Sequence, residues 1–314
     1  MISIDAAALA GALDYPSLIA ALRAAFQGGT VAPPRHHHHL APGPGAPEGT
    51  VLLMPAWVPG RYLGVKVVNV FAANGAAGLP AVHGVYLLFS GQTGVPLATL
   101  DGGELTARRT AAASALAAGY LARPDAERLL VVGTGRLAHH LAAAHAGIRP
   151  IRAIEIWGRN PARAAAVAAG LAAAGLPATP VENLPEAAAR ADIVSCATLS
   201  RTPLIQGEWL RPGAHLDLVG GFTPAMRETD DAAVARAHVF IDTAGAIAEA
   251  GDIAAPLASG RLARADIRAD LHDLSCGTHP GRTAADEITL FKSVGAATED
   301  LAGAILAYER FKAG

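Results

Sequence analysis

The segment from Leu129 to His145 constrains the fold of this 314-residue chain most strongly. It reads Leu-Leu-Val-Val-Gly133-Thr-Gly135-Arg-Leu-Ala138 and continues as His-His-Leu-Ala-Ala-Ala-His, the pattern of a strand, a glycine turn and a helix. In dinucleotide-binding folds such a turn lets the backbone approach a diphosphate, and the N–H groups of the helix N-terminus face it. We therefore expect Gly133, Thr134, Gly135 and Arg136 to contact the diphosphate of a dinucleotide.

The next apolar strand predicts which dinucleotide is bound. Ile154 to Trp157 is followed by Gly-Arg159-Asn160, at the place where such folds contact the adenosine ribose. NAD-binding forms usually carry an acidic residue there, whereas a guanidinium pairs with a 2′-phosphate. We expect Arg159 and Asn160 at the ribose, with NADP(H) preferred and NAD(H) also accepted. A solvated surface arginine is the alternative interpretation.

Strand-like runs alternate with helical segments through the second half of the chain. We place these strands at 129–132, 153–157, 192–196, 215–219 and 238–242, which predicts a parallel doubly wound α/β sheet of the Rossmann type. Ligands of such sheets bind beyond the carboxyl ends of the strands. Thr198, Leu199 and Val219 follow two of these strands and are further candidate cofactor contacts.

The first hundred residues have a different organisation. Residues 5–27 have a helical pattern, and a loop rich in proline, glycine and histidine is expected from 28 to 49. Short β-rich runs at 50–57, 62–71, 82–89 and 96–100, separated by glycine turns, then predict an antiparallel sheet. A final helix, 296–312, is expected to return to this first domain.

Charge and composition exclude several classes of partner. The net charge is −2 and the isoelectric point about 6.6, so no electrostatic footprint for nucleic acid or an anionic membrane is present. The N-terminus has no basic and apolar signal-peptide pattern, and the longest uncharged run is interrupted by glycine and proline. We expect a cytoplasmic protein that acts on a small molecule.

Three basic residues in the first domain are candidate ligands for an anionic substrate. Lys66 interrupts a β-rich run, Arg109 stands among alanines and threonines, and Arg35 follows two prolines. A lysine within an apolar strand carries a desolvation cost unless an anion compensates it. Together the three predict a clamp for a substrate carboxylate, although each alone is compatible with a solvent-facing position.

The chain resembles the ornithine cyclodeaminase/mu-crystallin family over nearly its whole length. The resemblance rests on seven segments in one order: 64–68, 78–84, 101–114, 132–135, 156–159, 207–213 and 288–295. It implies a substrate-binding and dimerisation domain formed by residues 1–112 plus 296–314, with an inserted NAD(P)-binding Rossmann domain at 113–295. It also implies homodimers, a substrate carboxylate on Lys66 and Arg109, a less secure match at Arg35, and nicotinamide contacts from Ser293, Val294 and Gly295.

One position departs from the ornithine cyclodeaminases. Phe222, in Gly-Gly-Phe-Thr-Pro, stands where those enzymes resemble this segment but carry an aspartate for amine chemistry. Phenylalanine neither accepts a proton nor pairs with an ammonium, so ornithine deamination is disfavoured. The segment resembles most the bacterial branch that reduces the cyclic imine Δ1-pyrroline-2-carboxylate to L-proline, in trans-3-hydroxy-L-proline catabolism, often with Δ1-piperideine-2-carboxylate, which gives L-pipecolate, as a second substrate.

The expected reaction is hydride transfer from NAD(P)H to the imine carbon, with a proton delivered to the ring nitrogen. His83 is one candidate donor because histidine titrates near neutral pH. A second candidate is Lys66, if burial lowers its pKa. The residues do not decide between them, and His83 is equally compatible with a purely structural position in a strand.

Two other interpretations stay open at this stage. The chain is also compatible with another family activity, alanine dehydrogenase or opine-type reductive amination, and with a non-catalytic NADPH-binding protein. His36 to His39 lie in a proline-rich segment without acidic or cysteine ligands at a fixed spacing, so no metal site is expected.

Overall fold

The computed structural model describes residues 1–41 and 47–313. The chain divides into two compact units. Unit 1 comprises Met1–Arg109 and Ala296–Gly314, and unit 2 comprises Thr110–Gly295. The residues of unit 1 are therefore discontinuous in sequence, and helix α3 (Gly102–Leu121) begins in unit 1 and ends in unit 2.

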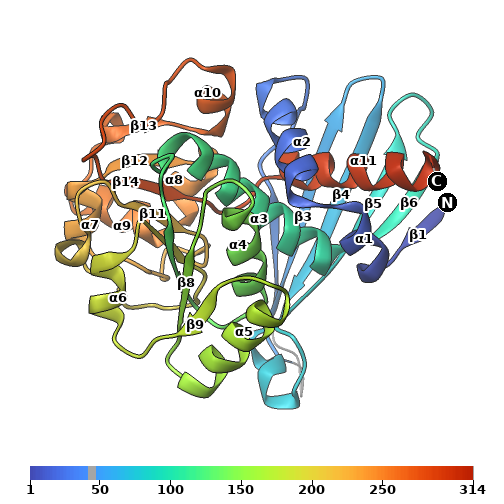
Figure 1. The fold of residues 1–314 in the computed structure, drawn as a ribbon. Coiled ribbons are helices and arrows are strands. Elements are labelled where there is room, and N and C mark those ends of the chain that lie inside the picture. The colour runs from blue at the N-terminus through green and yellow to red at the C-terminus, as the bar shows by residue number, and fades with distance from the viewer. Residues whose placement is uncertain (42–46, 314) are drawn as a thin grey trace. The chain divides into compact units, whose positions relative to one another are not determined.

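Unit 1 is built on one six-stranded sheet (Figure 1). The strand order is β1-β6-β5-β4-β3-β2, and every neighbouring pair is antiparallel except β1 with β6. The strands are β1 (Ile2–Ile4), β2 (His36–Leu40), β3 (Gly49–Val58), β4 (Tyr62–Val70), β5 (Val82–Ser90) and β6 (Pro96–Asp101). The 3-10 helix η1 (Ala72–Ala77) connects β4 to β5.

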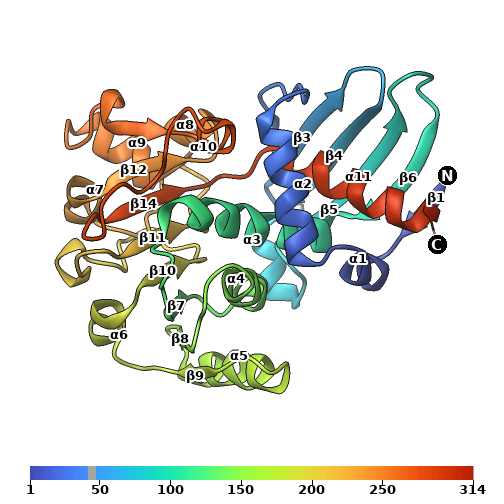
Figure 2. The ribbon, with the colours of Figure 1, turned by 45° about the horizontal axis from the view of Figure 1, so that its top comes forward.

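Among the described residues, three α-helices lie wholly in this unit, namely α1 (Ala6–Ala12), α2 (Tyr15–Gln27) and α11 (Ala297–Ala313). Asp5 and Asp14 cap α1 and α2 by accepting hydrogen bonds from backbone N–H groups, which explains where these helices begin. α11 lies beside α2 and against β3, β4 and β5 (Figure 2). The last helix of the chain thus belongs to the sheet formed by the first hundred residues.

Alternation along the strands gives the sheet of unit 1 two different faces. Met54, Lys66, Tyr86 and Leu88 are buried and share one face, because Met54 pairs with Lys66 and Lys66 with Tyr86 in the register. This is the face that α11 covers.

Unit 2 contains an eight-stranded sheet in which all pairs are parallel. Its order is β13-β12-β14-β11-β10-β7-β8-β9. The strands are β7 (Arg128–Val132), β8 (Ala153–Trp157), β9 (Ala178–Pro180), β10 (Ile193–Cys196), β11 (His215–Leu218), β12 (His238–Ile241), β13 (Ile267–Ala269) and β14 (Thr289–Lys292). From β7 the chain first adds β8 and β9 on one side and then β10 and β11 on the other, so the order reverses between β7 and β10.

Helices cover both faces of this sheet. They are the second part of α3, α4 (Arg136–Ala146), α5 (Pro161–Ala173), α6 (Leu184–Arg190), α7 (Asp231–Arg236), α8 (Gly245–Glu249), α9 (Gly251–Ala258) and α10 (Leu271–Cys276), with the 3-10 helices η2 (Gly207–Trp209) and η3 (Arg264–Asp266). Leu129 and Val131 join a core with α4 and α5, whereas Leu130 and Val132 join a second core with α6, α7 and α9. Successive residues of one strand thus point into two cores, as expected for a doubly wound sheet.

The five strands expected for this sheet are present, within a residue at each end, and the fold-class prediction is confirmed. The expected loop at 28–49 is wrong in part, because His36–Leu40 form the edge strand β2 on β3. The five residues of β2 are all exposed and do not alternate between apolar and polar side chains, so the sequence pattern did not indicate a strand there. β1, β9, β13 and β14 were also not predicted, and three of these four strands have only three residues.

None of the helices in the described part of the chain is long and apolar enough to cross a membrane.

Candidate functional site

The glycine turn after β7 has the geometry that a diphosphate requires. Gly133 has φ +132°, and a Cβ built on it would lie 2.5 Å from the carbonyl oxygen of Ala197, so only glycine fits. Gly135 is exposed, has no atom within 4 Å of such a Cβ, and begins α4 without a side-chain cap. Because no side chain caps this N-terminus, its backbone N–H groups suit an anion. The residues present therefore fit a dinucleotide, with the exposed Arg136 first in the helix.

The end of β8 lies directly beside this turn. Gly133 donates a hydrogen bond from its N–H to the carbonyl of Trp157 over 2.9 Å, and a Cβ on Gly158 would lie 2.4 Å from Cγ2 of Thr134. Arg159 is exposed at this end. Asn160 caps α5, since its Oδ1 accepts a hydrogen bond from the N–H of Arg163 over 3.2 Å. Asn160 thus has a structural role, and its contact with a ribose stays a prediction.

The carboxyl ends of β10 and β11 carry the other predicted contacts. Ala197 and Thr198 follow β10 and lie next to Gly133, where the strand order reverses. Ligands of doubly wound sheets bind at this reversal. Thr198 is half-buried, Leu199 is 67% exposed, and Val219 is buried directly after β11. The structure brings Thr198 to the glycine turn, and its contact with a cofactor stays a prediction.

Ser293, Val294 and Gly295 follow β14 and are buried. The N–H groups of Val294 and Gly295 both donate to Oδ2 of Asp242 over 2.7 Å. Asp242 follows β12, the neighbour of β14 in the sheet, and sequence reasoning missed it. Its carboxylate fixes the backbone of this predicted nicotinamide segment.

In unit 1 the structure brings Lys66 and Arg109 together around an acidic residue of α11. Lys66 Nζ lies 2.8 Å and Arg109 Nε 2.9 Å from the same Oδ1 of Asp300, and Arg109 Nη1 lies 2.6 Å from Oε2 of Glu299. All four residues are buried. The two cations expected to bind a substrate carboxylate are therefore already neutralised by two carboxylates of their own chain.

Burial and neighbouring charges change the acidity of this cluster. The pKa of Lys66 is lowered to about 8, mainly by desolvation and by the positive charge of Arg109, with Asp300 opposing the shift. Lys66 also donates to Thr106 Oγ1 over 3.3 Å. Burial and the charge of Asp300 raise the pKa of Tyr86 well above its ordinary value, and its hydroxyl has no hydrogen-bond partner among the described residues.

The remaining two candidates of unit 1 occupy different positions. Arg35 is half-buried directly before β2, next to His36, which pairs with Leu53. Arg35 therefore lies near the row of cross-strand neighbours that contains Met54 and Lys66. His83 is exposed on β5 and pairs with Asn69, three residues from Lys66, so alternation places it on the opposite face of the sheet from Lys66. The structure does not bring His83 to Lys66 and Arg109.

Glu299 and Asp300, like Asp242, are site residues that sequence reasoning missed. A signal was present, because two adjacent acids stand in Ala-Ala-Thr-Glu-Asp-Leu-Ala-Gly-Ala, a segment otherwise made of small or apolar residues. Buried acids are rare unless paired, so this spacing indicates a cationic partner. The partner itself could not be read from the sequence.

The four histidines form most of the exposed strand β2. His36 and His38 point to the same side, with ring centroids 6.4 Å apart. Among residues 1–41 and 47–313 no group of three or more His, Cys, Asp or Glu side chains is arranged to hold a metal ion.

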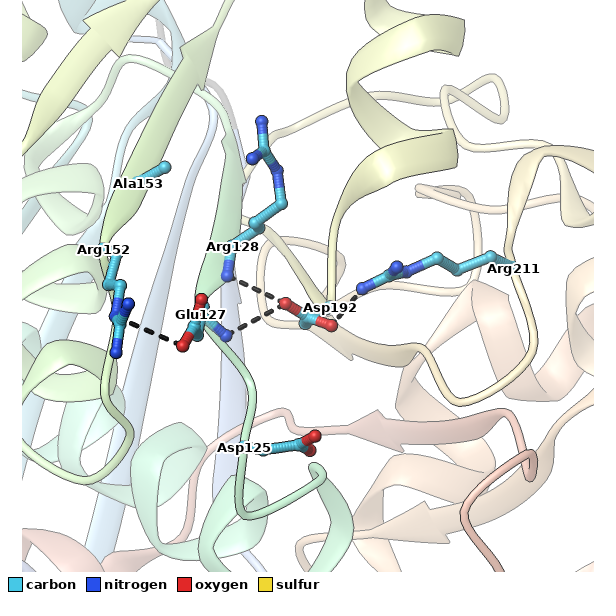
Figure 3. Close-up of a pocket in the computed structure, with 7 residues that line it drawn as sticks. All are labelled: Asp125, Glu127, Arg128, Arg152, Ala153, Asp192 and Arg211. Carbon is cyan, nitrogen blue, oxygen red and sulfur yellow. Dashed lines mark hydrogen bonds and ion pairs between the residues drawn. The ribbon is translucent and has the colours of Figure 1, made fainter.

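A separate pocket opens at the amino ends of the strands of unit 2 (Figure 3). Its charges are largely paired within the protein. Asp192 accepts hydrogen bonds from the N–H groups of Glu127 and Arg128, each over 2.9 Å, and forms an ion pair with Arg211, while Arg152 pairs with Glu127 over 3.2 Å. The glycine turn after β7 lies at the carboxyl ends of these strands, so this pocket is distinct from the predicted dinucleotide site.

The glycine turn of unit 2 and the buried charged cluster of unit 1 define the class of protein. It is a Rossmann-type dinucleotide-binding protein with an additional sheet unit that carries a buried cluster of two cations and two acids. The chain belongs to the ornithine cyclodeaminase/mu-crystallin family, whose sequence profile matches residues 8–314.

Two relatives match most of this chain. An uncharacterised protein of Schizosaccharomyces pombe is 46% identical over 312 residues, covering 96% of this chain and 94% of that protein. The Δ1-pyrroline-2-carboxylate reductase of Paracoccus denitrificans is 41% identical over 262 residues, 82% of each chain. The name of the first relative states no activity, whereas the second is named as a reductase.

Two solved structures share the fold over almost the whole chain. The Thermococcus litoralis Δ1-pyrroline-2-carboxylate reductase, in complex with NADH and L-proline, has a TM-score of 0.94 and 33% identity, covering 100% of this chain and 98% of that one. A dimeric archaeal alanine dehydrogenase with bound NAD has a TM-score of 0.91 and 27% identity, covering 99% and 96%.

Proposed function

We propose that this protein is an NAD(P)H-dependent reductase of Δ1-pyrroline-2-carboxylate, and of Δ1-piperideine-2-carboxylate as a second substrate, forming L-proline and L-pipecolate. The observation that carries the proposal is the match over the full chain to a reductase that binds NADH and L-proline. Phe222 in place of an acidic residue supports a cyclic imine over ornithine.

The charge balance of the cluster in unit 1 supports a zwitterionic substrate. Lys66 and Arg109 carry two positive charges, and Glu299 and Asp300 carry two negative charges. A protonated cyclic imine with its carboxylate also carries one charge of each sign. We propose that Lys66 and Arg109, with Arg35, bind the carboxylate, while the acids of α11 favour the positive ring nitrogen.

Lys66 is the proton donor in this proposal. The imine binds with a neutral ring nitrogen, Lys66 gives it the proton that makes it positive, and the imine carbon then accepts the hydride. An ammonium has three N–H donors, and Asp300 and Thr106 accept two of them. A pKa near 8 lets the group hold its proton at neutral pH and give it up during the reaction. His83, exposed on the opposite face of the sheet, is the weaker candidate.

The cofactor in this proposal is NADPH in preference to NADH. When bound, the reduced nicotinamide supplies the hydride that the imine carbon accepts. Gly133, Thr134, Gly135 and Arg136 would hold the diphosphate and Arg159 the 2′-phosphate. Thr198, Leu199, Val219 and Ser293 to Gly295 would line the nicotinamide side.

A homodimer is proposed as the functional assembly. On the sheet face of unit 1 that lies away from Lys66, Val65, Val67 and Leu87 are only half-buried and Val85 is 39% exposed. An exposed apolar sheet face suits a second copy of the chain. The dimer of the archaeal alanine dehydrogenase supports the same assembly. The cytoplasmic location and the place in hydroxyproline catabolism stay predictions from the sequence.

The proposed reaction is tested by following oxidation of NADPH and NADH by the purified protein. The substrates are the two cyclic imines and pyruvate with ammonia, and ornithine with NAD⁺ is the control. We expect rapid turnover of the imines that is lost in Lys66→Ala and Arg109→Ala variants that still bind the cofactor. Tight cofactor binding without turnover of either imine would contradict the proposal.

Alanine dehydrogenase activity is the second candidate, favoured by the structural similarity to the archaeal enzyme. It requires free ammonia with pyruvate, so turnover of that pair above the rate with the imines would select it. The binding-protein alternative predicts NADPH affinity with no turnover of any pair, and a buried cluster of four charged residues has no evident use in such a protein.

A further inference from the structure

A buried carboxylate in unit 2 joins the loops that follow two neighbouring strands. Oε1 of Glu228 accepts hydrogen bonds from the N–H and Oγ1 of Thr198, over 2.7 and 2.8 Å. Oε2 accepts from the N–H groups of Gly220 and Gly221, over 2.8 and 3.4 Å. Thr198 follows β10 and the glycines follow β11. One side chain therefore fixes the relative position of both loops at the carboxyl edge of the sheet.

The counter-charge of Glu228 comes from a third strand end. Lys292 is the last residue of β14, and its Nζ lies 4.0 Å from Oε2 of Glu228 and 3.7 Å from Oδ2 of Asp252. Asp252 in turn accepts hydrogen bonds from the N–H groups of Glu228 and Thr229, over 2.8 and 3.1 Å. All three charged side chains are fully buried. The triad of Glu228, Lys292 and Asp252 thus joins β10, β11 and β14.

The fit around the triad is close. A Cβ on Gly220 would lie 2.0 Å from the carbonyl oxygen of Thr198 and 2.6 Å from Oε1 of Glu228, so only glycine fits at this position. Buried charges of this kind contribute little net stability compared with well-packed apolar residues. Their position at the strand ends, where doubly wound sheets bind ligands, indicates a role in the site.

We propose that Glu228, with Lys292 as its counter-charge, is a positioning residue for the dinucleotide: it holds the loops after β10 and β11 in the arrangement that receives the nicotinamide half. The inference rests on the proposed nucleotide-dependent function, but it requires only cofactor binding and not turnover of a particular imine. Burial, opposed by Lys292, raises the pKa of Glu228 to about 7, in keeping with a carboxylate that the fold holds at an energetic cost.

The test is the dissociation constant for NADH of Glu228→Gln, measured by the fluorescence of the bound cofactor. The amide keeps one acceptor oxygen, but its NH2 group faces backbone donors, so the hydrogen bonds to one of the two loops are lost. We expect the dissociation constant to rise about tenfold or more, because these are hydrogen bonds to a charged group. The KM for NADH should rise in parallel, with a smaller change in kcat.

The matched control is Asp217→Asn. Asp217 is an equally buried carboxylate on β11, but it accepts hydrogen bonds from Ser114 and Ser195, over 2.9 and 2.6 Å, and not from the strand-end loops. We expect this variant to lose thermal stability with its NADH affinity unchanged. A Glu228→Gln variant that behaves in the same way would overturn the proposal and leave Glu228 a structural residue.

A second variant, Glu228→Asp, covers the case in which Glu228→Gln does not fold. It keeps the negative charge beside Lys292, but its side chain is one methylene shorter and cannot reach both loops, so we expect a folded protein that binds NADH about tenfold more weakly. Affinity equal to that of the wild type would overturn the inference. Failure of the wild type to bind NADH or NADPH would overturn the proposed function as well, whereas NADH binding without imine reduction would affect the proposed function alone.

Discussion

Removing the charge of Asp300 is the most direct test of the buried cluster in unit 1. Its side chain is fully buried, and one oxygen accepts from both Lys66 Nζ and Arg109 Nε, at 2.8 and 2.9 Å. Asn at this position keeps the size and a neutral acceptor. The two cations then share only Glu299, so one buried positive charge is left without a compensating negative charge.

Removal of one partner from a buried ion pair typically costs about 3–5 kcal/mol. For a unit of this size such a loss corresponds to a decrease in Tm of about 10–20 °C. We expect Asp300→Asn to show this decrease in a thermal unfolding experiment followed by circular dichroism. The double variant with Lys66→Met removes the uncompensated cation. Its loss of unfolding free energy should therefore be smaller, by about 1–3 kcal/mol, than the sum of the losses of the two single variants.

The control is Asp14→Asn in the same unit. Asp14 pairs with Arg310 over 2.6 Å, but the two side chains are 49% and 39% exposed, and Asn retains the helix-capping function. An exposed pair contributes about 0–1 kcal/mol. If Asp300→Asn is no less stable than Asp14→Asn, the argument that the cluster is buried and mutually neutralised is wrong.

Three further predictions concern the proposed reaction. With Lys66 as proton donor, the rate of imine reduction should decline as the pH rises through about 8, because the protonated form of Lys66 is lost. In Lys66→Arg this decline should disappear from the pH profile of kcat/KM. A profile that is unchanged in the variant would exclude Lys66 as the donor. Gly133→Ala places a Cβ 2.5 Å from the carbonyl oxygen of Ala197 and should weaken NADH binding by about tenfold or more in titrations, an expectation that wild-type affinity would contradict. Arg159→Ala should raise the KM for NADPH about tenfold with little change for NADH, and an equal effect on both cofactors would argue against a 2′-phosphate contact.

Local patterns were sufficient for most of unit 2. The glycine turn at Gly133 and Gly135 was visible because backbone sterics act within a few residues, and the strands around it were visible as apolar runs. β14 was missed as a strand, although its residues were recognised as a motif. It lies between β11 and β12 in the sheet, and both Thr289 and Lys292 are fully buried there, so its apolar pattern is incomplete.

The same limit applies to the candidate sites. Lys66 and Arg109 stood out because a charge in an apolar segment needs compensation, and that requirement is readable from neighbouring residues. Which group compensates it was not readable. Asp300 lies 234 residues from Lys66 and 191 from Arg109 along the chain.

The sequence alone therefore determined the type of each long element, the dinucleotide turn and the presence of buried cations, since these depend on local sterics and periodicity. The tertiary structure decided that α11 brings Glu299 and Asp300 to Lys66 and Arg109, that strand register turns His83 away from Lys66, and that Glu228 joins the loops after β10 and β11. These arrangements follow from pairing between distant segments, and sequence periodicity carries no information about which distant segments pair.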